Sequence, residues 1–249
     1  MAKGKVVCIY GAKGGIGKST FTLNLAGVIS NIKKKVLILD FDLSNGAIAC
    51  SLNSNINKTI FNFCEDYANN RFSDMENYIN SYNENIDFIS SPKDPRQANK
   101  IDIKLLDVLI DKCVYKYDCI LIDTSYVLDE VNVFALDKSD NILFMTTNDI
   151  VALKNLKNVL NIMNDNDFKN YKIILNNSVY PSKDYFSLFD LKSILNNNID
   201  YIISSSFYYK KMDNLIINGE IATLKYNNFN DYKIFELIAN DVLKEGKDE

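Results

Sequence analysis

The 249-residue chain has no histidine, only two arginines and only three prolines. Without histidine, imidazole general-base chemistry and histidine metal ligation are excluded, so carboxylates, hydroxyls and amines must supply any chemistry. The prolines fall in connections and mark no linker between domains. The five cysteines form no Cys-x-x-Cys pair and lie among apolar neighbours, which favours reduced core residues.

Long apolar runs and basic patches are missing as well. No run reaches the ~18 apolar residues that a membrane span needs, and no signal peptide precedes the first apolar run, so we expect a cytoplasmic protein. A net charge of −4 offers no general attraction to nucleic acid or anionic lipid. Residues 229–249 carry six acidic and three basic side chains, so no membrane-binding helix is expected there. Lys33-Lys34-Lys35 is interpreted as a solvated turn, and DNA binding is not expected.

The length of the chain and a hydrophobic fraction of 47% suit one large domain, which we expect to span 1–249. Apolar runs of strand length alternate with helix-like stretches, a pattern typical of an α/β fold. The pattern predicts a mostly parallel, twisted sheet of about seven or eight strands with helices on both faces. We expect strands at 5–10, 36–39, 86–90, 118–122, 141–146, 172–176 and 199–203, and helices at 19–31, 58–69, 73–81, 102–115, 149–164, 186–196, 209–218 and 229–245.

Residues 11–20, GAKGGIGKST, lie between the first apolar run and a helix-like stretch. Strand, glycine turn and helix start form a phosphate site, because backbone N–H groups and the helix dipole point at an anion. Lys18 would contact the β- and γ-phosphates and the Ser19 hydroxyl would bind Mg²⁺, which makes the predicted domain a P-loop NTPase. The expected phosphate-binding residues are Gly14, Gly15, Ile16, Gly17, Lys18, Ser19 and Thr20.

The stretch KGGIGKS at 13–19 resembles the deviant Walker A signature of the ParA/MinD ATPases. The resemblance implies ATP as the nucleotide and an ATP-dependent homodimer. It also implies that Lys13 crosses the dimer interface and contacts the partner's nucleotide, which gives Lys13 and Lys18 catalytic roles.

Asp40 and Asp42 follow the second apolar run. Two carboxylates at i and i+2 of an extended chain point the same way, and beside a phosphate loop they can hold Mg²⁺ waters or orient an attacking water. The resemblance implies that Asp40 lies near the metal and that Asp42 positions the hydrolytic water. Residues 43–46 would then form a switch that senses the γ-phosphate.

Asp123 ends the apolar run at 119–122, the form expected of a Walker B strand whose carboxylate reaches Mg²⁺ through water. Relatives in the ParA/MinD family usually continue with a turn that contains proline and glycine, whereas this chain reads SYVLDE at 125–130. Without glycine at position 127, no unhindered backbone N–H is available there to the γ-phosphate. We therefore expect ATP binding with slow hydrolysis.

Asn176 follows another predicted strand, and the resemblance implies that its amide hydrogen-bonds the adenine. The loop at 205–212 is a second candidate for enclosing the base. Several looser motifs resemble the CpaE/TadZ branch of the family, the pilus-assembly localisation ATPases. They are DLSNGA at 42–47, Ser91-Pro92, Tyr117-Asp118, LDE at 128–130, and TTND at 146–149 with Leu153 and Asn155.

These features lead to the hypothesis of a Mg·ATP-dependent dimerisation switch that positions a pilus or secretion apparatus through a protein partner, with recruitment to a pole or a membrane-bound machine. Four alternatives stay open at this point. They are a plasmid or chromosome partition ATPase, a division-site ATPase, a nucleotide-binding scaffold without turnover, and a bacterial tyrosine kinase. The last is disfavoured because the 15 tyrosines are spread along the chain rather than clustered at its end.

Overall fold

The computed structural model describes residues 2–165, 170–179, 185–207, 212–227 and 231–244. At its centre is an eight-stranded sheet with the order β3-β4-β2-β5-β1-β6-β7-β8. All neighbouring strands are parallel except β3 and β4. The strands are β1 (Lys5–Tyr10), β2 (Val36–Asp40), β3 (Asn80–Ser81), β4 (Ile86–Ile89), β5 (Cys119–Asp123), β6 (Asn141–Thr146), β7 (Tyr171–Asn176) and β8 (Tyr201–Ile203).

The sheet separates two apolar cores, and alternate residues of each central strand contribute to opposite cores. In β1, Val6, Cys8 and Tyr10 join one cluster while Val7 and Ile9 join the other. Because both faces are covered, these strands consist of almost uninterrupted apolar residues, as is usual for parallel sheets. The predicted α/β architecture is confirmed.

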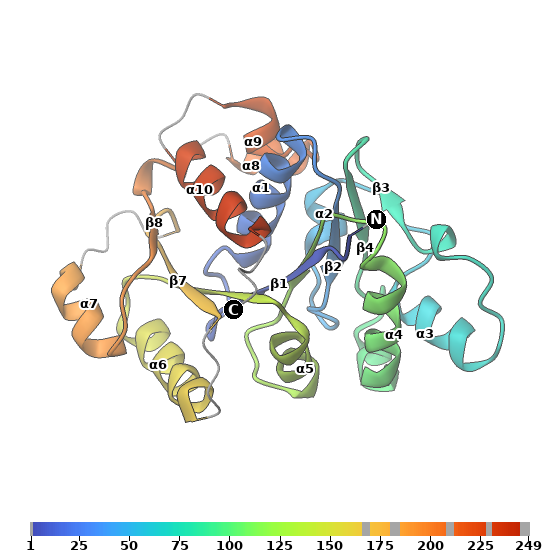
Figure 1. The fold of residues 1–249 in the computed structure, drawn as a ribbon, viewed down its shortest axis with the longest axis horizontal. Coiled ribbons are helices and arrows are strands. Elements are labelled where there is room, and N and C mark those ends of the chain that lie inside the picture. The colour runs from blue at the N-terminus through green and yellow to red at the C-terminus, as the bar shows by residue number, and fades with distance from the viewer. Residues whose placement is uncertain (1, 166–169, 180–184, 208–211, 228–230, 245–249) are drawn as a thin grey trace.

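Helices pack on both faces (Figure 1). The face that carries Val7 is covered by α1, α8, α9 and α10, and the opposite face by α3 to α7. Among the described residues, no helix is both long and apolar enough to cross a membrane. The α-helices are α1 (Lys18–Asn31), α2 (Ile48–Ser51), α3 (Ile60–Ala68), α4 (Ile103–Cys113), α5 (Glu130–Lys138), α6 (Ile150–Asp165), α7 (Leu188–Leu195), α8 (Met212–Ile217), α9 (Ala222–Lys225) and α10 (Tyr232–Leu243), with 3-10 turns η1 (Met75–Asn77), η2 (Pro95–Lys100) and η3 (Ser205–Phe207).

The predicted helix at 73–81 is wrong. Its place is taken by η1 and the short strand β3, which pairs antiparallel with β4. The Asn83 side chain accepts hydrogen bonds from the N–H groups of Asn85 and Ile86 and so folds the chain back onto β4. The Tyr78 ring stacks on the Phe72 ring with 6.1 Å between the ring centroids, which anchors the segment before the turn. Tertiary pairing therefore overrides the helical pattern.

Helix α5 was not predicted from the sequence. It begins at a clear local signal, because the Asp129 carboxylate caps it by accepting a hydrogen bond from the Asn132 N–H at 2.9 Å. Residues 209–211 of the predicted helix at 209–218, and both ends of the one at 229–245, lie outside the described residues. The prediction of one domain over 1–249 stays a prediction.

Candidate functional site

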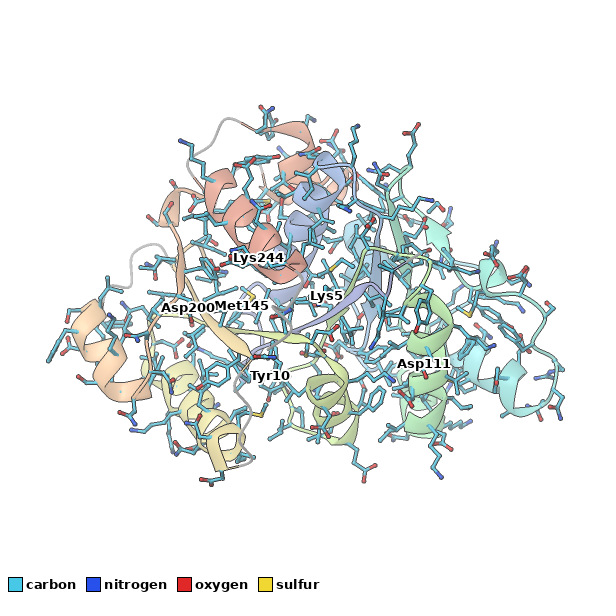
Figure 2. All side chains as sticks on the ribbon, viewed as in Figure 1. Lys5, Tyr10, Asp111, Met145, Asp200 and Lys244 are labelled. Carbon is cyan, nitrogen blue, oxygen red and sulfur yellow. The ribbon has the colours of Figure 1, made fainter. Side chains whose placement is uncertain are left out.

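Three motifs that lie far apart in the sequence meet at the carboxyl edge of the sheet. The glycine loop follows β1, residues 40–42 end or follow β2, and Asp123 ends β5. Strand β5 lies between β2 and β1, so all three motifs come from adjacent strands. Lys5 and Tyr10, the two ends of β1, are marked in Figure 2. Parallel α/β sheets bind their ligands at this edge.

The phosphate loop needs glycine at Gly15, whose φ is 72°, and at two closely packed positions, Gly17 and Gly11. Gly17 precedes α1 with φ of 89°, where the amide nitrogen of Asn176 would lie 2.8 Å from an added Cβ. At Gly11, an added Cβ would lie 2.3 Å from Ile16 Cδ1 and 2.8 Å from the Met145 carbonyl oxygen. Gly11 therefore serves the close packing of the loop against β6, which explains a glycine one place earlier than the usual motif has it.

Lys18 and Asp123 form the charged centre of the site. Lys18 is 8% exposed, and burial lowers its pKa despite the opposing effect of Asp123 and Asp42. Thr22 donates a hydrogen bond to Asp123 Oδ1 at 3.1 Å, and the Ser19 side chain also hydrogen-bonds this carboxylate. Burial nevertheless raises the pKa of Asp123 to about 6. A buried cation, a hydroxyl and a carboxylate thus converge at the start of α1.

Asp40 lies beside Asp123 in the register of β2 and β5, and both are fully buried. Asp40 Oδ2 accepts a hydrogen bond from the Ile48 N–H at 3.2 Å, and the Ser91 side chain also hydrogen-bonds the Asp40 carboxylate. Burial and the neighbouring Asp123 raise the pKa of Asp40 well above its ordinary value.

One oxygen of each carboxylate is left without a partner. Asp40 Oδ1 and Asp123 Oδ2 are buried and accept no hydrogen bond within the described part of the chain. Oxygen atoms of this kind suit the hydration shell of Mg²⁺, so the donor set fits the predicted cation. The described residues hold no group of three or more acidic or cysteine side chains that could bind a metal ion. Phosphate oxygens and water would have to supply the other ligands.

Asp42 lies just beyond β2, in the wall of a pocket of about 210 Å³. Its Oδ1 accepts a hydrogen bond from the Asn45 N–H at 3.2 Å, within the predicted switch segment. Ser125, Tyr126 and Val127, from the turn after Asp123, also line this pocket. Asp42 and the turn after Asp123 therefore line the same small pocket.

That turn covers the phosphate loop. A Cβ added to Gly14 would lie 3.4 Å from Cδ1 of the Tyr126 ring. The backbone N–H of Val127 donates to Ser125 Oγ at 3.3 Å, and Asn132 donates to the same hydroxyl at 2.6 Å. The N–H at position 127 is therefore engaged within the turn.

Lys13 forms an ion pair with Asp149 at 2.9 Å, and the two side chains are 29% and 13% exposed. Thr147 also donates to Asp149 at 2.6 Å. Burial opposes ionisation of Asp149, but the hydrogen bonds from Thr147 and Lys13 outweigh it and lower its pKa. Asn155, on α6, donates to the Ala12 carbonyl at 3.1 Å. The start of α6 therefore holds the tip of the phosphate loop.

Asn176 connects β7 to the phosphate loop. Its amide nitrogen donates to the Ile16 carbonyl at 2.9 Å, and its oxygen accepts from the N–H and the hydroxyl of Ser178 at 3.1 and 2.6 Å. Asn176 lines an apolar pocket of about 220 Å³ beside Gly15 and Gly17. Its predicted contact with adenine stays a prediction. Residues 208–211 of the candidate loop at 205–212 lie outside the described residues.

Sequence reasoning missed the roles of Asp149 and Thr22. Asp149 follows β6 by three residues and caps α6 through the N–H groups of Val151 and Ala152, a local signal that could have drawn attention to it. Thr22 carried no signal, because threonine in the first turns of a helix is common. Its contact with Asp123 spans 101 positions of sequence and becomes visible only in the fold.

Comparison with known proteins gives a consistent result. Residues 4–179 match the family described as AAA domain. The septum site-determining protein MinD of Helicobacter pylori is 26% identical over 158 residues, which cover 64% of this chain and 58% of that protein. A ParA family ATPase from Chlorobium tepidum has a TM-score of 0.83 at 19% identity, covering 95% of this chain and 98% of that one. MinD of Pyrococcus horikoshii complexed with Mg-ADP has a TM-score of 0.79 at 22% identity, and the match covers 96% of this chain and 95% of that one.

Proposed function

Since the chain belongs to the ParA/MinD family of AAA-domain proteins, we propose that it binds Mg·ATP and acts as a dimerisation switch with slow ATP hydrolysis. The observation that carries this proposal is the convergence of buried Lys18, Ser19 and Asp123 at the first turn of α1. A phosphate chain laid along the glycine loop would meet the Lys18 ammonium and the positive end of the helix dipole.

Ser19, Asp40 and Asp123 would hold Mg²⁺, the two carboxylates through water. The support is the pair of buried carboxylate oxygens without partners, since a hydrated cation would satisfy both. When bound, Mg²⁺ would neutralise charge on the phosphates. The likeness to a structure named for its complex with Mg-ADP agrees with this assignment.

Lys13 would act in the dimer. In the single chain it is held by Asp149, so it must exchange one anionic partner for another before it can reach across an interface. A nucleotide on a second copy would be such a partner, because phosphate oxygens are strong acceptors for an ammonium group. The ion pair with Asp149 would keep Lys13 ordered while the chain is a monomer.

Asp42 would position the attacking water, because it lies close enough to Lys18 and Asp123 to affect their ionisation. The proposal of slow turnover rests on the turn after Asp123. Its Val127 N–H is engaged with Ser125, and its Tyr126 ring lies over Gly14, so fewer backbone donors face the γ-phosphate position. If no backbone donor of the turn reaches the γ-phosphate, the protein would bind ATP without hydrolysing it and act as a scaffold.

The cargo of the switch is proposed to be a pilus or secretion apparatus, recruited through a protein partner. This assignment rests on the resemblance of the motifs at 42–47 and 146–149 to the CpaE/TadZ branch. The relatives reported above are named for septum site determination and for the ParA family, which favours division-site or partition positioning as the second candidate.

The mass of the Asp42→Ala protein in solution tests the switch. Measured by light scattering without nucleotide, with Mg·ADP and with Mg·ATP, it should double only with Mg·ATP, because loss of Asp42 should prevent the hydrolysis that separates the subunits. Lys18→Ala in the same background should remain a monomer. An unchanged mass, with ATP binding verified separately, would remove the dimerisation step.

Two further assays on the ATP-bound dimer separate the cargo classes. Retention on non-specific DNA that falls steeply with salt would favour partition. Sedimentation with anionic liposomes only in the presence of ATP would favour a division-site ATPase. The pilus or secretion proposal expects neither.

A further inference from the structure

The hydroxyl of Ser125 is held in one orientation by two hydrogen-bond donors. Ser125 follows Asp123 by two residues and is half-buried in the turn that leads to α5. Its Oγ accepts a hydrogen bond from the Asn132 amide nitrogen at 2.6 Å and another from the Val127 N–H at 3.3 Å. A hydroxyl group has two lone pairs and one proton. Because both lone pairs are occupied, the proton must point away from Asn132 and Val127.

The orientation of the Asn132 amide is itself fixed. Asn132 is buried in the first turn of α5, and the nitrogen that donates to Ser125 also donates to the Val127 carbonyl oxygen. A carbonyl oxygen only accepts, so a reversed amide would place two acceptors against each other. Asn132 Oδ1 accepts no hydrogen bond within the described part of the chain, so it does not receive the Ser125 proton.

The Ser125 proton is directed into the pocket of about 210 Å³ that Asp42 also lines, since Ser125 belongs to the lining and Asn132 lies behind it. The Ser125 hydroxyl donates to no other described residue. Asp42 and Asp129 are the charged residues of the described lining, and both are anionic. An acidic wall of this kind admits an anion only where a donor faces it.

Other side chains of the lining also carry donors, but they differ from Ser125 in two respects. They are exposed, and no hydrogen bond to another described residue fixes their polar groups. These residues are Ser44, Asn45, Asn99 and Tyr126. In the described part of the chain, the Ser125 hydroxyl is thus the donor of this pocket whose direction is set before any ligand binds.

The pocket lies beside the place proposed for the terminal phosphate. After burial, which is the dominant cause, the charge of Asp42 also contributes to the pKa values of Lys18 and Asp123, so its carboxylate lies close to both. On the other side of Ser125, the Tyr126 ring lies 3.4 Å from a Cβ added to Gly14 of the phosphate loop. Ser125 is therefore next to the loop and next to the Lys18 ammonium.

We infer that the Ser125 hydroxyl donates a hydrogen bond to the γ-phosphate of bound ATP, and that Asn132 is a positioning residue that orients it. The inference rests on the proposed function, because it assumes that ATP occupies the glycine loop. A donor that is oriented in advance needs no reorganisation when the anion arrives. ADP has no phosphate at this place, so Ser125 would make the site discriminate between ATP and ADP.

Calorimetric titration of the full chain with Mg·AMP-PNP and with Mg·ADP tests the inference, because AMP-PNP keeps the terminal phosphate and resists hydrolysis. Every variant carries Lys13→Ala, which should prevent dimerisation and confine the comparison to contacts within one chain. Ser125→Ala should weaken Mg·AMP-PNP binding about tenfold, as expected for one hydrogen bond to a charged group, and change Mg·ADP binding by less than about twofold. Ser125→Thr retains the hydroxyl and should keep the ratio of the two affinities to within about threefold.

Asn132→Ala tests the orienting role. Without the amide the Ser125 hydroxyl can rotate, so the ratio of Mg·AMP-PNP to Mg·ADP affinity should fall several-fold. In a protein that already carries Ser125→Ala, the same substitution should not lower this ratio further, because Asn132 acts through the hydroxyl. A merely structural role of Asn132 would change the ratio equally in both backgrounds.

Ser139→Ala is the matched control, since Ser139 is a half-buried serine that follows the opposite end of α5. It should keep the parent ratio. An unchanged ratio in Ser125→Ala would overturn the inference, as would an Asn132→Ala effect of equal size with and without the Ser125 hydroxyl. Failure of the parent protein to bind Mg·ADP, or Mg·ADP binding that survives Lys18→Ala, would instead refute the proposed nucleotide site.

Discussion

Replacing Asp123 with Asn should stabilise the nucleotide-free protein and, at the same time, remove the magnesium dependence of its nucleotide binding. Burial raises the pKa of Asp123 to about 6 from an ordinary value of 3.8. This difference of roughly two pH units corresponds to about 3 kcal/mol of unfavourable free energy when the folded protein must ionise the group. Removing the charge should also lower the pKa of Asp40, since Asp123 is the second cause of its increase after burial.

The direction in which stability changes with pH follows from proton binding. Between pH 4 and pH 6 the folded chain holds a proton on Asp123 that the unfolded chain has lost, so stability falls as pH rises through this window and levels off above it. An Asn side chain does not titrate, and it places no second negative charge beside Asp40, its neighbour in the register of β2 and β5. Allowing for imperfect packing, the gain at pH 8 should be about 1 to 3 kcal/mol, and about 1 kcal/mol less at pH 5.

Urea unfolding at pH 5 and pH 8, in EDTA and without nucleotide, measures this effect by circular dichroism. Asp137→Asn is the control, because Asp137 is an exposed carboxylate of α5. It should change stability by less than about 0.5 kcal/mol at either pH. A less stable Asp123→Asn protein at pH 8, or a gain that is equal at both pH values, would refute the reasoning. In calorimetry, the variant should bind ADP equally with Mg²⁺ and with EDTA, whereas the wild-type protein should bind it more tightly with Mg²⁺.

Two further predictions concern residues that hold the phosphate loop. Asp149→Asn removes the carboxylate that forms an ion pair with Lys13 but keeps an oxygen to cap α6. The Asp42→Ala protein that also carries this substitution should therefore dimerise with Mg·ATP at a several-fold lower concentration, as measured by light scattering over a dilution series. An unchanged midpoint would show that the ion pair does not oppose dimerisation. Asn176→Ala leaves the Ile16 carbonyl and Ser178 without their partner, so urea unfolding should show a loss of about 1 to 3 kcal/mol and calorimetry a several-fold weaker affinity for Mg·ADP. Wild-type affinity in that variant would show that Asn176 does not position the loop.

Much of the fold could be read from local patterns. The apolar runs of the central strands are uninterrupted because both faces of the sheet are buried, and they predicted seven of the eight strands. The eighth strand, β3, was not predicted because a strand of two residues has no sequence pattern of its own. It exists only because β4 offers an edge and the Asn83 turn returns the chain to it.

The sequence by itself predicted the proposed phosphate loop, since the glycines, Lys18 and Ser19 are contiguous and their chemistry depends on one strand-turn-helix unit. It also placed Asp40 and Asp123 at strand ends, because the carboxyl ends of parallel strands meet at one edge. Only the tertiary structure decided that Lys13 pairs with Asp149, that Thr22 supports Asp123, and that Asp213 lines the apolar pocket. Such contacts join elements more than 100 residues apart, and they depend on which helix packs against which strand, a choice made by burial of the whole apolar surface rather than by any local motif.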